Sequence, residues 1–500
     1  MYFLLTLVAA ASSLLYWVYW RWTNRRLLEL ASSIPGPPAY PFIGNATIFL
    51  FNTKDQLNKI AKMFDEYGEY CRFWLGPELN ITVKNPADIR LLLTSNKVNH
   101  KGPQYKFMIP FIGGGILSGG PTWRNHRKIA TPSYNKKSVQ IFADIFNAEA
   151  EVLANTLSKK NPGDTFNIFY DVLNSTTAAV CQTLMGLSKE EYKDLKNLRE
   201  VMLQTQRMYD LIFKQMTQWW LQIPFIYWLT GTRKRQLYYQ KLVDEFSSDI
   251  VARRHKALET TRVHEDAMGI VDRYILSGEL TEEEIKQETF TLFTTSQEAA
   301  AKITSGVLLF LGLLPDWQKQ VYDEVMQVVG YGPVTEQHLK ELHYLDMVYK
   351  ETLRYFSIAG LIQRTVEEEV TINDGKITLP AGTSLVIPIH ELHRDPKHWE
   401  DPLRVMPERF LPENVKKRDP NAFVPFSLGA MDCLGRVFAT ALIKTLVVHT
   451  IRKVHITSEG PTSNLELEIA ISVKAAKGYN VRVKPRETNG YHKANGIKQH

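Results

Sequence analysis

Residues 2–20 carry no charged side chain, and this stretch restricts how the chain can fold more than any other. As a helix rising 1.5 Å per residue, it would span about 28 Å, close to the hydrocarbon thickness of a bilayer. Arg21, Arg25 and Arg26 follow it, and no lysine or arginine precedes it. We therefore expect residues 1–33 to form a membrane anchor, with the N-terminus in the lumen and the rest of the chain in the cytosol.

A cleaved signal peptide is also apolar, but it begins with basic residues and ends at a cleavage site with small side chains. Here the small residues lie inside the stretch, at 9–13, and aromatic residues gather at its end, as they do at membrane interfaces. These features favour an anchor. Residues 34–38 (IPGPP) then predict a stiff extended hinge, because proline fixes φ and lacks an amide hydrogen.

A second apolar and aromatic segment lies at residues 219–229, which read WWLQIPFIYWL. Pro224 interrupts it, and the basic run of residues 233–235 follows it. A core helix would explain the apolar residues. The proline and the basic residues are equally consistent with a loop that rests in a membrane interface.

The composition indicates a single large catalytic domain. The chain has 500 residues, of which 44% are hydrophobic and 23% charged, and it contains no linker-like segment or repeat. We expect this domain at residues 34–485 and a polar, disordered tail at 486–500. The net charge of +7 is too dilute for a nucleic-acid-binding protein but suits an anionic membrane surface or an acidic partner. The 3 cysteines form no disulfide framework, which indicates a reducing compartment.

The periodicity of apolar residues predicts a mainly α domain with a minor β part. Strands are expected where short alternating runs occur, at residues 70–76, 80–85 and 370–389, the last containing a turn at Asn373-Asp374-Gly375. Helices are expected at residues 86–95, 138–159, 233–259 and 281–314. The last of these is the longest. Thr281 and the three glutamates after it are a helix-start signal, and Pro315 ends the pattern.

Chemically, the most informative cysteine is Cys433, within FVPFSLGAMDCLGRVFA. Gly429 and Gly435 flank it and Phe426 precedes it, so the backbone can approach a flat ligand and an aromatic ring can shield the sulfur. From the residues alone, a thiolate metal ligand and a redox-active thiol of low pKa both remain open. Cys71 and Cys181 lie in strand-like and helix-like contexts, and we interpret them as inert buried thiols.

This segment resembles the cysteine loop of the cytochrome P450 family, F-x-x-G-x-R-x-C-x-G followed by an alanine, here Ala439. The resemblance implies a helix-rich triangular prism that binds haem b, with Cys433 as the axial thiolate of the iron. It extends from about residue 35 to 485. Phe426, Gly429 and Gly435 fall on the corresponding positions of the loop.

Other motifs of that family follow in the same order. Trp123 and Arg127 in WRNHRK match the helix whose arginine binds a haem propionate, and Arg364 matches a second propionate-binding arginine. Glu351 and Arg354 in KETLRYF match the E-x-x-R helix. Arg409 in PERF matches the arginine that completes a salt-bridged triad with them. WRNHRKIATPSYN, YLDMVYKETLRYF and FVPFSLG resemble the microsomal family-four clan of insects.

The resemblance implies a monooxygenase in the endoplasmic reticulum membrane that oxidises a lipophile such as a fatty acid, a hormone-like lipid or a xenobiotic. Electrons would come from NADPH through NADPH–cytochrome P450 reductase, with cytochrome b5 as an additional candidate partner. His126, Lys128 and Arg436 are candidates for basic contacts with the reductase. Candidate pocket residues lie at 107–111, 293 and 358–361.

Two positions depart from the family pattern. The arginine two residues before the cysteine is Met431, so one propionate contact is missing. The oxygen-binding bend of the longest helix has Ala299 in place of the family's threonine. In the family that hydroxyl helps to deliver protons, and we expect Thr295, Ser296 or Glu298 to substitute for it.

These departures leave rival functions open. One is a haem-thiolate isomerase or dehydratase of lipid hydroperoxides, which would need no reductase. The other is a catalytically silent protein that binds haem or another ligand. Consumption of NADPH with a reductase would distinguish the monooxygenase from both, and turnover of hydroperoxides would distinguish the two rivals from each other.

Overall fold

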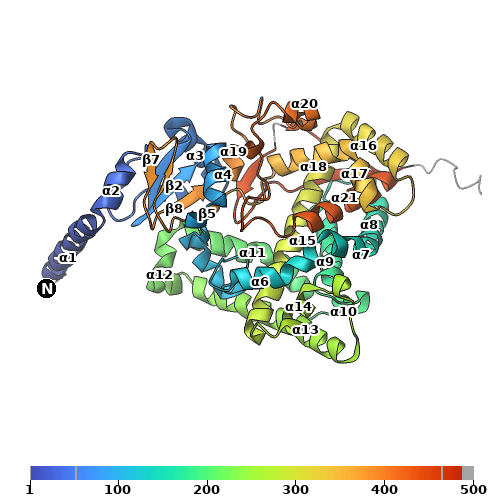
Figure 1. Ribbon diagram of the computed structural model, residues 1–500, viewed down its shortest axis with the longest axis horizontal. Helices are drawn as coiled ribbons and strands as arrows, with labels where there is room; N and C mark the ends of the chain where they lie inside the picture. The colour runs from blue at the N-terminus through green and yellow to red at the C-terminus, as the bar shows by residue number, and fades with distance from the viewer. Residues whose placement is uncertain (1, 51–52, 463–464, 487–500) are drawn as a thin grey trace, which may run out of the picture.

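Helix α15 (Glu282–Leu313) passes through the interior of the protein and organises the fold (Figure 1). The computed structural model describes residues 2–50, 53–462 and 465–486. The Thr281 side chain accepts a hydrogen bond from the amide of Glu284, whose carboxylate accepts one from the amide of Thr281. This reciprocal cap fixes the start of α15, as the sequence predicts. Pro315 begins the next helix after a bend of 113°.

The fold is mainly helical with a minor β part, as expected. The α-helices are α1 (Tyr2–Thr23), α2 (Arg25–Ser32), α3 (Thr53–Tyr67), α4 (Pro86–Thr94), α5 (Ile109–Ile112), α6 (Trp123–Ala130), α7 (Lys136–Ile141), α8 (Ala143–Ser158), α9 (Phe169–Thr183), α10 (Lys189–Lys193), α11 (Leu198–Thr217), α12 (Pro224–Leu229), α13 (Thr232–Thr260), α14 (Ile270–Ser277), α15, α16 (Pro315–Val328), α17 (Glu336–Glu341), α18 (His343–Tyr355), α19 (Ile389–Leu392), α20 (Pro412–Val415) and α21 (Arg436–Lys453). The strands are β1 (Tyr70–Leu75), β2 (Glu78–Val83), β3 (His100–Lys101), β4 (Phe166–Asn167), β5 (Ile362–Thr365), β6 (Val370–Ile372), β7 (Ile377–Leu379), β8 (Ser384–Ile387), β9 (Val454–Thr457), β10 (Leu467–Ile469), β11 (Val473–Ala475) and β12 (Asn480–Pro485).

A five-stranded sheet in the order β1-β2-β8-β5-β3 lies beside the helical part, near α1 (Figure 1). Only the pairing of β2 with β8 is parallel; the other neighbours in this sheet run antiparallel. In β3 and β5, Lys101 lies directly opposite Arg364. The largest apolar core surrounds α15 and includes side chains of α8, α9, α13, α18 and α21. The cysteine loop precedes α21, so this core sets the distance between the loop and α15.

Most expected elements are present, with one difference. The predicted strands at 70–76 and 80–85 are β1 and β2, and Asn373-Asp374-Gly375 forms the turn between β6 and β7 with φ of 53°, 53° and 82°. The helix expected at 138–159 is divided into α7 and α8 at Phe142. Phe142 is buried against Phe438 of α21, with ring centroids 6.4 Å apart, so the bend lets both helices contact α21. Most of the expected polar tail, residues 487–500, lies outside the described residues.

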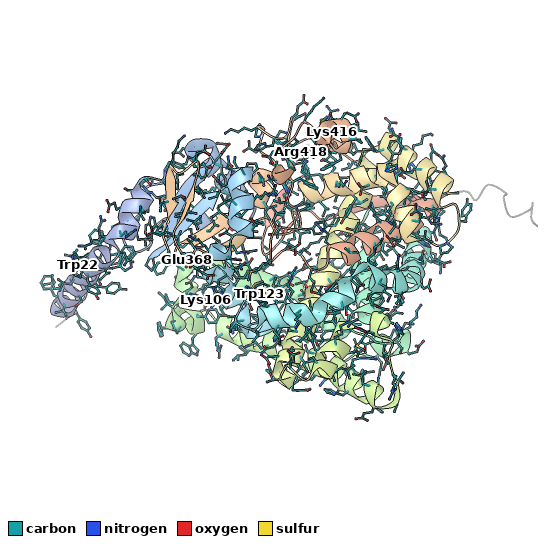
Figure 2. All side chains as sticks on the ribbon, in the orientation of Figure 1. Trp22, Lys106, Trp123, Glu368, Lys416 and Arg418 are labelled. Atoms are coloured by element: carbon teal, nitrogen blue, oxygen red, sulfur yellow. The ribbon has the colours of Figure 1, made fainter. Side chains whose placement is uncertain are left out.

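The N-terminal helix α1 extends away from the body of the protein (Figure 1), and Trp22, which Figure 2 labels, lies near the end of α1 that leads into α2. Its exposed side chains include Tyr2, Phe3, Leu15 and Tyr16. Among the described residues, no single helix is long and apolar enough to cross a membrane by length and hydropathy, although the bent pair of α15 and α16 passes that test.

Candidate functional site

The thiol of Cys433 lies in a cavity of about 300 Å³ between α15 and the loop that precedes α21. The sulfur is accessible from this cavity although it lies deep in the protein. Leu292, Ala300 and Ile303 of α15 contribute apolar walls. Trp123, which Figure 2 labels near the centre of the molecule, is buried at the edge of the same cavity.

The cysteine loop depends on glycine at one position. Gly429 has φ of +77°, and a Cβ atom built on it would lie 2.0 Å from the carbonyl oxygen of Leu93 in α4. A side chain here would therefore displace the loop from α4. The amide of Cys433 donates a hydrogen bond of 2.8 Å to the carbonyl of Phe426, which closes the loop beneath the cavity. Gly435 then directly precedes α21, and the amide of Ala439 donates back to its carbonyl.

Three cations line the same cavity: Lys101, Arg127 and Arg364. Arg127 donates to the carbonyl of Asp432 at 2.7 Å and to its carboxylate at 2.5 Å. Among the described residues, no carboxylate forms an ion pair with Lys101 or Arg364. Like charges directly opposite each other on paired strands repel. Burial, and then the charges of Arg364 and Arg127, lower the pKa of Lys101 well below its ordinary value.

This arrangement fits haem. A flat apolar macrocycle suits the aliphatic and aromatic walls, two carboxylate arms suit cations that lack a carboxylate partner, and the iron suits a thiol. Burial raises the pKa of the Cys433 thiol, while the amide of Gly435 opposes that shift. A coordinating metal ion deprotonates such a thiol. The residues present therefore match the prosthetic group that the resemblance implies.

The wall formed by α15 carries the residues around the family's oxygen-binding bend. Thr295, Ser296 and Ala299 all line the cavity. The hydroxyl of Thr295 donates to the carbonyl of Thr291 at 2.7 Å, so its hydrogen is used within the helix. The hydroxyl of Ser296 lies 3.2 Å from that of Tyr134, which also lines the cavity. Burial raises the pKa of Tyr134 above its ordinary value, so this phenol stays protonated at neutral pH.

Glu298, in contrast, is bound to a buried lysine. Its carboxylate lies 2.7 Å from the ammonium group of Lys302, one turn further along α15. Lys302 also donates to the hydroxyl of Ser472, in the turn between β10 and β11. Glu298 is 6% exposed and Lys302 3%. The acid is therefore held by an ion pair that also attaches this hairpin to α15.

Behind the cysteine loop, Glu351, Arg354 and Arg409 come together as a buried cluster. Glu351 accepts two hydrogen bonds from Arg354, at 2.7 and 2.8 Å, and its other neighbour, Arg409, lies at 3.5 Å. Arg354 also donates to the carbonyls of His393, Pro402 and Arg404. Each of these contacts connects α18 to the segment that leads into the cysteine loop, and none reaches the cavity. The cluster therefore holds α18 against the segment that leads into the cysteine loop.

Two expectations were wrong. His126 cannot meet a reductase at the surface, because it is 3% exposed and its ring bonds to Glu288 of α15 at 2.8 Å; Lys128 and Arg436 are exposed. Phe293 does not line the cavity but packs in the core against Phe246, with ring centroids 4.7 Å apart, and none of the candidates at 107–111 lines the cavity either. Lys101, Tyr134 and Lys302 were not predicted as site residues from the sequence. An isolated lysine or tyrosine carries no signal; only the i, i+4 spacing of Glu298 and Lys302 could have indicated their pair.

Known proteins match this chain over nearly its whole length. A family model described as Cytochrome P450 matches residues 34–481. Cytochrome P450 4c3 of Drosophila melanogaster is 28% identical, over 97% of this chain and 95% of its own length. Cytochrome P450 4V2 of Mus musculus is 30% identical, over 90% of this chain and 89% of its own. Cytochrome P450 4g15 of Drosophila melanogaster is 26% identical, over 94% and 95%. The expected similarity to family four, insect members included, is confirmed.

The pair of Glu298 and Lys302 predicts a large effect on stability. Lys302→Met should lower the free energy of unfolding by about 3–5 kcal/mol, because it leaves a buried carboxylate without its partner. The double variant Glu298→Gln, Lys302→Met should recover most of that loss. Urea unfolding at pH 7 measures both. Lys319→Met is the matched control, since Lys319 pairs with Asp323 at the same helical spacing on the surface and should contribute little. An equal loss in both single variants would contradict the prediction.

Proposed function

The chain belongs to the cytochrome P450 family of haem-thiolate monooxygenases, and we propose that it inserts one oxygen atom of dioxygen into a lipophilic substrate. The proposed electron source is NADPH, through NADPH–cytochrome P450 reductase, with cytochrome b5 as an additional donor. The observation that carries this proposal is the position of the Cys433 thiol in an apolar cavity that Arg127, Arg364 and Lys101 also line, the last two without a carboxylate partner among the described residues. Haem b, bound through its iron to Cys433, would supply the activation of dioxygen.

The protein's own residues would hold this group in place. Arg127 and Arg364 are the proposed partners of its two carboxylates, and Trp123 lies beside them at the cavity edge. We assign the contact that Met431 cannot make to Lys101, because this lysine lies opposite Arg364 and faces the same cavity. Phe426, Gly429, Gly435 and Ala439 would let the loop and the start of α21 approach the macrocycle.

Proton delivery is assigned to Ser296 and Tyr134. The two hydroxyls are within hydrogen-bond distance of each other and both reach the cavity. A hydrogen bond donated by the Tyr134 hydroxyl to the Ser296 oxygen would leave the proton of the Ser296 hydroxyl free to point into the cavity, at the wall where Ala299 lacks a hydroxyl. Thr295 is the second candidate of this wall, although it donates to its own helix. Glu298 could donate or accept a proton in the cavity only if its ion pair with Lys302 opened.

The apolar walls of this cavity and of a cavity beside it support a lipophilic substrate. A second cavity of about 150 Å³ adjoins it, and the two share Tyr105 and Ile362 in their walls. Met108, Phe213 and Leu361 make the second cavity apolar. Ile358 and Ala359 line the first. These walls would favour a chain or ring system that buries apolar surface.

Attachment to the endoplasmic reticulum membrane by a single pass of α1, with the catalytic domain in the cytosol, is part of the proposal. The exposed apolar side chains of α1 and the arginines after it support an anchor. The segment at 219–229 supports a second membrane contact rather than a core helix. Phe225 and Trp228 of α12 are each 66% exposed, and Leu229 is 65% exposed.

One observation favours a second candidate function. Ala299 lines the cavity where the family has a hydroxyl for proton delivery. An isomerase or dehydratase of lipid hydroperoxides needs neither that hydroxyl nor a reductase. Such an enzyme would use the same haem site, with Cys433 as the thiolate ligand.

The ligand assignment predicts a spectrum. The reduced protein with carbon monoxide should show the red-shifted Soret band of thiolate ligation, and Cys433→Ser should abolish that band. Cys181→Ser is the control, since Cys181 is buried in α9 away from the cavity and should leave the band in place. A wild-type spectrum typical of histidine ligation would contradict the assignment.

The proposed proton delivery by Ser296 and Tyr134 predicts how much of the NADPH consumed yields oxidised product and how much is lost as hydrogen peroxide. Ser296→Ala should raise the ratio of hydrogen peroxide to product by up to about 10²-fold, the scale of a positioned proton-transfer group. Ala299→Thr should lower that ratio. Ser305→Ala is the control, because Ser305 is buried in α15 and does not line the cavity. An unchanged ratio in both test variants would exclude Ser296. Hydroperoxide turnover without reductase, and no NADPH-dependent product, would favour the second function.

The anchor predicts the behaviour of the protein in microsomes. The full chain should resist alkaline extraction, and a tag at its C-terminus should be digested by protease added outside sealed vesicles. Without residues 1–33 the protein should be released more readily, with α12 retaining part of the binding. A C-terminal tag that is protected in sealed vesicles would refute the cytosolic orientation.

A further inference from the structure

A separate cavity of about 350 Å³ lies where the N-terminal helix meets the body of the protein. The end of α1 and helix α2 form one side of it, and residues 39–44, which follow the hinge, and strand β1 form the other. Tyr16, Trp17, Trp20 and Trp74 give it aromatic walls. It shares no lining residue with the cavity around Cys433.

This cavity is a built part of the fold. Trp20 of α1 packs edge-on against Trp74 of β1, with ring centroids 5.8 Å apart. The amide of Arg72 donates to the carbonyl of Pro35 at 2.9 Å. A Cβ atom on Gly36 would lie 2.1 Å from the Arg72 carbonyl oxygen, so only glycine allows the hinge to approach the strand this closely. Helix, hinge and strand therefore hold one another around the cavity.

Two arginines in its lining have no acidic partner. Among the described residues, neither Arg21 nor Arg72 pairs with a carboxylate or donates a side-chain hydrogen bond to the protein. The Nε atom of Arg72 is buried without an acceptor. The guanidinium of Arg21 lies 5.0 Å from the centre of the Trp17 ring. Arg26, by comparison, pairs with Glu369 at 2.8 Å.

A buried guanidinium nitrogen without an acceptor is costly, and two arginines that line one cavity favour an anion that accepts several hydrogen bonds. Phosphate has that chemistry. The aromatic walls and the exposed apolar side chains of α1 indicate that the phosphate belongs to an amphiphile whose chains can lie along α1.

We propose that this cavity binds the phosphate-bearing head group of an anionic phospholipid. Arg72 contacts the phosphate from the strand and Arg21 from the helix, while the tryptophans and Tyr16 surround the glycerol region. A bound lipid would then connect α1 to β1 and fix the orientation of the catalytic domain at the membrane. This site is independent of the oxidation chemistry proposed above.

Calorimetric titration of the detergent-solubilised full-length holoenzyme tests the proposal. The probes are dihexanoyl phosphatidylglycerol, dihexanoyl phosphatidylcholine and inorganic phosphate, each below its micellar concentration where it has one. The phosphatidylglycerol should bind saturably and at least about 10-fold more tightly than either other probe, as expected when charged hydrogen bonds add to apolar contacts.

Variants locate the site. Arg72→Gln and Arg21→Gln should each weaken binding of the phosphatidylglycerol by about 10-fold or more, the scale of a hydrogen bond to a charged group. Arg25→Gln is the matched control, because Arg25 is exposed on the same segment but does not line the cavity, and it should bind normally. Should Arg72→Gln misfold, the exposed Arg21 still provides the test.

Three results would overturn the proposal. Equal binding of inorganic phosphate would indicate a simple anion site. Equal binding of phosphatidylcholine would exclude selection by charge. An equal loss in Arg25→Gln would indicate diffuse attraction to the basic segment. Thiolate spectra and NADPH-dependent turnover do not depend on this site, so failure here and failure of the monooxygenase proposal are distinguishable.

Discussion

The buried guanidinium of Arg354 is the contact on which the position of the cysteine loop depends. It is inaccessible to solvent, and its donors are used by Glu351 and by the carbonyls of His393, Pro402 and Arg404. A buried charge is tolerated only with such complete pairing. Because these carbonyls belong to the segment before the cysteine loop, the helix α18 fixes where that loop begins. The thiol of Cys433 can then face α15 across the cavity.

Helix α15 connects its neighbours through buried charges as well as apolar packing. Glu288 binds His126 of α6 and accepts the amide of Ile116, while Lys302 binds the turn between β10 and β11. These pairs hold α6, which carries Trp123 and Arg127, and the hairpin at fixed positions along one helix. One consequence is that the carboxylate of Glu298 is held in an ion pair by Lys302 and is not free to transfer a proton in the cavity. The cavity wall is left with hydroxyl groups, of which Ser296 has an external partner in Tyr134.

Patterns among neighbouring residues were enough to predict many of the helices, turns and loop features of this protein. The capped start of α15, the turn at residues 373–375 and the glycines beside Cys433 follow from backbone preferences that neighbouring residues dictate. The spacing of Cys433 within its loop predicted a functional thiol, and the resemblance to the family identified it as the expected ligand of the iron. The separate E-x-x-R motif predicted that Glu351 and Arg354 share a helix face. The break at Phe142 was not predictable, because it depends on packing against α21.

By itself, then, the sequence determined the fold class, the identity of the thiol and the apolar N-terminal helix, because each rests on residues close together in the chain. Only the tertiary structure decided which charges meet. It placed Lys101 opposite Arg364 through the pairing of β3 with β5 and buried His126 against Glu288. It also left Arg21 and Arg72 on one cavity with no acidic partner in the part of the chain that the structure describes. The energy of a charge depends on burial and on partners that are distant in the chain, and a local pattern encodes neither.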